Sequence, residues 1–174
     1  MGQNVCCRYG PGRLPYASRR DVGGGVAMMA TGLLAAVLWF GGAGLLLATG
    51  IAGENVGFLF AIGTLFVPLA APTAFVVGTL LWRYAYSDRN RQLCGALFGA
   101  VTPVICLGVG AFGPAALVAA DNVARGEMGV LEGVAFGLLL VPIGFGFALV
   151  AAGWFVGLVG AFGGWYHERA KQIP

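Results

Sequence analysis

Residues 133–166 read GVAFGLLLVPIGFGFALVAAGWFVGLVGAFGGWY, without a single Asp, Glu, Lys, Arg or His. A helix needs roughly 20 apolar residues to cross a bilayer core about 30 Å thick, and this stretch is longer than that. As an ideal helix it would extend roughly 51 Å, because each residue adds about 1.5 Å. Proline interrupts a helix, so we expect a kink at Pro142 and a helix that extends past the membrane.

Three more charge-free stretches, residues 22–53, 55–82 and 92–120, complete the pattern. All ten Lys and Arg residues and all seven Asp and Glu residues lie outside the four stretches, and charged residues make up 10% of the chain. Soluble domains carry about 25%. We therefore predict an all-α integral membrane protein with four transmembrane helices. Residues 22–172 form one domain, and residues 1–21 form a disordered tail.

Basic residues are distributed unequally between the two sides that four spans create. Nine lie on the side of the termini: Arg8, Arg13, Arg19, Arg20, Arg83, Arg89, Arg91, Arg169 and Lys171. The other side holds a single basic residue, Arg125, together with the acids Glu54, Asp121, Glu127 and Glu132. Because Lys and Arg accumulate on the cytoplasmic side, we expect a multi-pass protein of the cell membrane with both termini cytoplasmic.

The N-terminal tail offers no separate function. It lacks an apolar core ahead of residue 22, so we do not expect a cleavable signal peptide. Gly2 with Cys6 and Cys7 resembles an acylated terminus, but myristoylation prefers Ser or Thr where Cys6 stands. Palmitoylation of Cys6 or Cys7 stays open. Anionic lipid headgroups account for the basic residues beside the spans, so we expect no nucleic-acid partner.

Two similar heptads follow the second and fourth stretches: YSDRNRQ at 86–92 and YHERAKQ at 166–172. Each stretch also carries a Val-Pro pair, Val67-Pro68 in one and Val141-Pro142 in the other. The pattern favours two antiparallel hairpins related by a parallel pseudo-repeat, with an axis along the membrane normal. Convergence stays open, because aromatic and then basic residues suit any cytoplasmic helix end.

Small residues recur every four positions in several stretches. This spacing places them on one helix face, where they let two helix backbones approach closely. The predicted packing positions are Gly95, Gly99, Gly129, Gly133, Gly137, Gly153 and Gly157, and the series Ala70, Ala74 and Gly78 repeats the pattern. Such faces can pack within one chain or between copies.

The predicted spans hold no residue that commonly carries chemistry inside a membrane. Pumps, coupled transporters and voltage sensors place ionisable residues there, and none is present. No CxxC motif occurs and His167 is the single histidine, so we expect no metal and no cofactor. The available hydroxyls belong to Thr31, Thr49, Thr64, Thr73, Thr79 and Thr102. A threonine in a span usually bonds its own helix carbonyl, so we predict a protein that is not an enzyme, with lipid chemistry as a weaker alternative.

Packing motifs without ionisable residues predict an accessory, assembly or structural subunit that acts through helix packing. Its partners would be the lipid bilayer and either another membrane protein or further copies of itself. Five basic residues form a candidate cytoplasmic docking surface: Arg83, Arg89, Arg91, Arg169 and Lys171. The alternative is a small channel or facilitator for a neutral solute, because proline-kinked helices can expose backbone carbonyls to a cavity.

Overall fold

The computed structural model describes residues 19–51, 53–85 and 90–171, and every regular element within them is a helix. Residues 1–18, which include Cys6, Cys7 and most of the predicted tail, lie outside the described residues. In chain order the elements are α2 (Arg20–Ala48), α3 (Glu54–Thr64), α4 (Val67–Tyr84), α5 (Arg91–Gly110), α6 (Phe112–Ala124), α7 (Val130–Ala148), a π-helical turn (Leu149–Gly153) and α8 (Trp154–Ala170).

Three helical segments are long and apolar enough to cross a membrane: Asp21–Ala48, Arg91–Ala124 and Val130–Ala170. The pair α3 and α4 makes a fourth if the two are taken as one bent span. The prediction of an all-helical chain with long apolar helices is therefore confirmed for the described residues, with three or four candidate spans.

The break between α3 and α4 bends the chain by 56°. Tight turns end α3, since the Leu65 N–H donates to the Ile62 carbonyl at 3.0 Å and the Phe66 N–H to the Gly63 carbonyl at 3.0 Å. Pro68 lies in the first turn of α4, where its missing N–H interrupts the hydrogen bonding of a continuous helix. The bend in this stretch therefore lies just ahead of Pro68, whereas Pro72 lies within the continuous helix α4.

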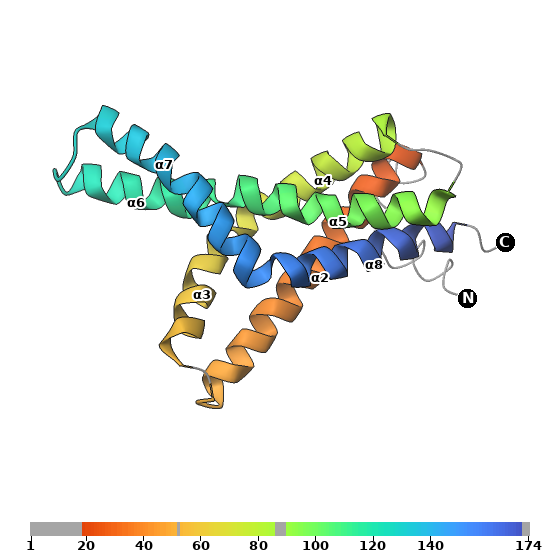
Figure 1. Cartoon of the computed structure of the whole chain (residues 1–174), viewed down its shortest axis with the longest axis horizontal. Helices are drawn as coiled ribbons and strands as arrows, with labels where there is room; N and C mark the ends of the chain where they lie inside the picture. The colour runs from red at the N-terminus through yellow and green to blue at the C-terminus, as the bar shows by residue number, and fades with distance from the viewer. Residues whose placement is uncertain (1–18, 52, 86–89, 172–174) are drawn as a thin grey trace.

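In residues 133–166 the α-helix is interrupted after Pro142 and not at it. Helix α7 continues through Pro142 as far as Ala148, and the irregular backbone comes later, in the π-helical turn Leu149–Gly153. A π turn holds an extra residue in one helical turn and shifts the faces of the helices on either side. Figure 1 shows α7 and α8 running in different directions on either side of this turn.

Figure 1 shows the helices as three arms. The start of α2, the end of α4, the start of α5 and the end of α8 lie together at one end. The α2–α3 connection and the α6–α7 hairpin point away from this end in two different directions. We call the first half of α2 with α4, α5 and α8 the packed half, and the rest of α2 with α3, α6 and α7 the splayed half.

Candidate functional site

The closest helix contact is a glycine seam between α5 and α8, formed by the buried residues Gly95, Gly99, Gly160 and Gly164. A Cβ atom added to Gly99 would overlap the carbonyl oxygen of Gly160, and a Cβ on Gly160 would overlap that of Gly99. Gly95 and Gly164 make the same reciprocal approach. Each Cα–H therefore faces a carbonyl of the other helix, a contact worth about 0.5–1 kcal/mol.

A second close contact joins α2 to α4. A Cβ on Gly25 would overlap the Thr79 hydroxyl, and one on Gly78 would lie 2.9 Å from the Cβ of Met28. Gly78 and Ala74, both from the predicted small-residue series, are buried here. The α5–α8 and α2–α4 contacts therefore leave no room for a larger side chain at these glycines.

Two predicted packing residues of α7, Gly133 and Gly137, face α6. A Cβ on Gly133 would overlap Val123, and a Cβ on Gly137 would lie 3.1 Å from the Cβ of Ala119. These two glycines therefore bring together the helices of one arm within the splayed half.

The remaining predicted packing residues lie in other environments. Gly129 precedes α7, and its N–H donates to Oε2 of Glu132 at 3.0 Å, which caps the start of the helix. Gly153 lies in the π-helical turn, and a Cβ there would come to 3.9 Å from the Leu107 side chain. At Gly157 an added Cβ would meet nothing within 4 Å. The structure thus brings Gly95 and Gly99 together with Gly160 and Gly164, which the sequence had not singled out.

A buried carboxylate links α4 to α8 at the end of the packed half where both of these helices end, which we call the packed end. The indole Nε1 of Trp82 donates to Oε1 of Glu168 at 2.7 Å, and Nζ of Lys171 donates to the same oxygen at 3.0 Å. Glu168 is 1% exposed and Trp82 is 2% exposed. We call Trp82, Glu168 and Lys171 the Glu168 clamp. The sequence shows its acid and base one helical turn apart, but nothing in it marks Trp82 as their partner.

Four of the five predicted docking residues lie at the packed end of the described chain: Arg83, Arg91, Arg169 and Lys171. The Arg83 guanidinium lies 5.4 Å from the ring centroid of Tyr84, and that of Arg169 lies 5.0 Å from the ring of Trp165. Arg89 lies outside the described residues. At least three of these cations therefore already have partners within the chain, because Lys171 belongs to the Glu168 clamp.

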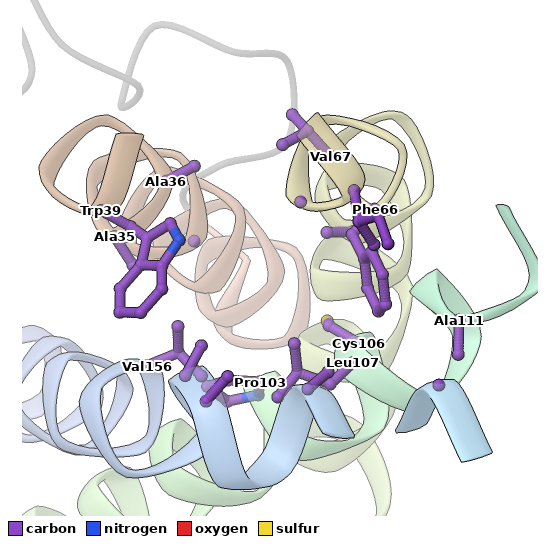
Figure 2. A pocket seen from close by; sticks show the side chains of 18 of the residues that line it. Ala35, Ala36, Trp39, Phe66, Val67, Pro103, Cys106, Leu107, Ala111 and Val156 are labelled. Carbon is purple, nitrogen blue, oxygen red and sulfur yellow. The ribbon is translucent and has the colours of Figure 1, made fainter. Parts of the chain in front are cut away.

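A cavity of about 520 Å³ lies where the packed half gives way to the splayed half. Figure 2 shows Trp39 from α2, Phe66 beside α4 and Val156 from α8 around this space. Its lining is almost wholly apolar, and no Asp, Glu, Lys, Arg or His from the described residues contributes to it. The aromatic residues of the lining are Trp39, Phe40, Phe58, Phe66 and Phe147.

The interruptions in three segments meet at this cavity. Phe66 marks the α3–α4 break, Ala111 marks the α5–α6 junction, and Ala151 and Ala152 belong to the π-helical turn; all four residues line the cavity. Short π-helical turns inside α-helices often occur at functional sites. The cavity is therefore our candidate functional site.

The hydroxyls of the two threonines that line the cavity already donate hydrogen bonds within their own helices. Thr31 donates to the Ala27 carbonyl at 2.8 Å, and Thr102 donates to the Phe98 carbonyl at 2.7 Å. Among the described residues no group of three or more His, Cys, Asp or Glu could hold a metal ion. The arrangement favours contact with an apolar occupant over chemistry on a polar one.

No protein-family model, curated protein or solved structure matches this chain.

Proposed function

We propose that this chain is a four-span integral membrane protein of the cell membrane, with both termini cytoplasmic. Large apolar side chains on its surface support this placement: Leu131 is 84% exposed and Val150 is 82% exposed. Contiguous apolar surface is unfavourable in water, but lipid chains solvate it well. The basic helix ends, gathered at the packed end, favour the cytoplasmic side for that end.

The proposal includes two antiparallel hairpins related by a pseudo-repeat. The first hairpin is α2 with α3 and α4; the second is α5 and α6 with α7 and α8. Each closes through glycines, Gly25 with Gly78 in the first and Gly99 with Gly160 in the second. The first pairs α2 with α4 and the second pairs α5 with α8, which is the equivalence that a duplicated hairpin would produce.

We assign to it a non-catalytic role as an accessory or assembly subunit. The main support for this role is that α3 and α7 of the splayed half bury almost none of their residues. Helix α3 has no buried residue, and α7 has only Gly133. A self-sufficient helix bundle buries one face of each helix. A membrane partner or a second copy would supply the missing face, and the basic packed end would dock any cytoplasmic component.

Photocrosslinking tests this role with two matched positions. Leu139 in α7 is 67% exposed and Leu158 in α8 is 66% exposed, so the two differ in the half they occupy rather than in accessibility. A photoreactive residue at 139 should capture protein, and one at 158 should capture mainly lipid. Equal capture of lipid alone at both positions, with a monodisperse monomer after mild detergent extraction, would reject the role.

The cavity also bears on the second candidate, a facilitator for a neutral solute. Its size favours a bound molecule, but its apolar lining and committed hydroxyls offer a polar solute no hydrogen bonds. Purified protein in liposomes tests this alternative. Unchanged permeability to water, glycerol and other small neutral solutes would reject it.

A further inference from the structure

We propose that the cavity between the two hairpins is a binding site for one hydrocarbon chain of a membrane lipid. This inference rests on the membrane placement proposed above, since that placement supplies the ligand. It does not depend on the accessory role, because a bound lipid chain and a protein partner on the outer faces can coexist.

The size of the cavity fits a small or flexible ligand. Its volume is about 520 Å³. Small-molecule sites of about 300–1,000 Å³ are common, and a flexible hydrocarbon chain adapts to such a space.

Chemistry selects hydrocarbon over water. A buried water needs two to four polar partners. The hydroxyls of Thr31 and Thr102 already donate to their own helices, and the other cavity-lining side chains are apolar except for the thiol of Cys106 and the indole N–H of Trp39. Left empty, the space would forfeit the dispersion contacts of its whole lining. A lipid chain restores those contacts without leaving a polar group unpaired.

The position of the cavity selects a bilayer lipid as the source. Its lining comes from the middle of the long helices, at the level of the helix interruptions, where the surrounding bilayer is hydrocarbon. Phe58 of α3 meets Phe147 of α7 edge to face at 6.4 Å, and both rings line the cavity. This aromatic pair bridges the two arms and adds two apolar rings to the wall that a lipid chain would contact.

Fluorescence quenching by lipids with brominated acyl chains tests the proposal in vesicles. The variant Trp154→Phe/Trp165→Phe retains Trp39 in the cavity and Trp82, which is 2% exposed and serves as a constant background. The companion Trp39→Phe/Trp165→Phe retains Trp154, which is 63% exposed. We expect brominated lipid to quench both variants, because a chain reaches each indole.

Filling the cavity separates its occupant from the surrounding bilayer. Ala36→Phe and Ala71→Phe each place a ring in the cavity, whereas Ala61→Phe makes the same change on the exposed face of α3. Either filling variant should reduce the quenching of Trp39 at least about twofold and leave that of Trp154 unchanged. Ala61→Phe should alter neither. Unchanged Trp39 quenching in both filling variants, or no Trp39 quenching at the outset, would overturn the proposal.

Native mass spectrometry of the unaltered chain provides a measurement that needs no variant. Released from phospholipid nanodiscs, the protein should retain one lipid after the detergent adducts are removed. Bare protein alone would contradict the site. If Trp154 also escaped quenching, the membrane placement itself would fail; if quenching and retention held while photocrosslinking captured no protein, the accessory role alone would fail.

Discussion

The packed and splayed halves are built from the same glycine-rich helices, yet the glycines of the two halves meet different neighbours. In the packed half, Gly99 and Gly160 approach until each backbone touches the other. In the splayed half and near it, Gly41, Gly42 and Gly146 would leave an added Cβ with nothing within 4 Å. Glycine content alone therefore does not pack helices. What lies opposite decides the contact: the Gly160 backbone faces Gly99 in the packed half, and the Val123 side chain faces Gly133 in the splayed half.

The largest loss of stability should come from Gly99→Leu, in the glycine seam of the packed half. Its Cβ would overlap the Gly160 carbonyl, which belongs to rigid helix backbone and cannot rotate aside. We expect the free energy of unfolding to fall by about 3 kcal/mol, at the upper end of the usual effect of overpacking. Titration with a denaturing detergent, followed by tryptophan fluorescence, measures the change.

Gly157→Leu is the matched control, because an added Cβ at Gly157 of α8 meets nothing within 4 Å. It should change the free energy of unfolding by no more than about 0.5 kcal/mol, as surface substitutions usually do. Equal losses in the two variants would show that the seam tolerates a larger side chain no worse than an open position of α8.

The next largest effect should come from Glu168→Ala, which opens the polar contact between α4 and α8. It leaves the indole N–H of Trp82 and the ammonium of Lys171 without this acceptor. A buried donor without a partner costs about 1–3 kcal/mol, so we expect a loss of about 2 kcal/mol by the same titration. Glu168→Gln keeps an acceptor oxygen for Trp82 and should lose less.

Glu127→Ala, an exposed acid in the α6–α7 arm, provides the comparison for Glu168→Ala. Its effect should stay within about 0.5 kcal/mol. If Glu168→Ala were as mild as Glu127→Ala, the clamp would not contribute to holding the two hairpins together.

The sequence predicts much of the packed half, but not the partner of each helix face. Four-residue spacing points to Gly95 and Gly99, and both residues lie in the seam. On the opposing helix the same rule marked Gly153 and Gly157, one face away from Gly160 and Gly164. Both faces of α8 fit the spacing, and only the approach of α5 decides between them.

The sequence predicts less of the splayed half and of the cavity. Pro68 lacks an N–H to donate, so it predicts an interruption of the helix near the α3–α4 break. Pro142 predicts a kink, but α7 continues as a helix through this residue. The π-helical turn Leu149–Gly153 contains no proline or charge, so no local signal marks it. Since the cavity forms where these interruptions meet, it follows from tertiary packing and not from a motif.

A smaller difference should appear in amide hydrogen exchange of the two halves in detergent micelles. Helix α3 has no buried residue, whereas α5 buries five, so local opening should be easier in α3. We expect amides of α3 to exchange roughly tenfold faster or more than those around Gly99, a difference of about 1.4 kcal/mol in opening free energy. Equal protection would mean that the splayed half is as firmly held as the packed half.

The smallest effect should come from Thr102→Val, at the boundary between the two halves. Thr102 is 2% exposed and its hydroxyl donates to the Phe98 carbonyl, one turn back in its own helix. Valine keeps the shape and removes only that bond, and side-chain hydrogen bonds of buried membrane residues average about 0.6 kcal/mol. A loss near that value in the detergent titration is expected. A loss above about 2 kcal/mol would mean that the hydroxyl serves a polar occupant, and would count against an apolar cavity between the halves.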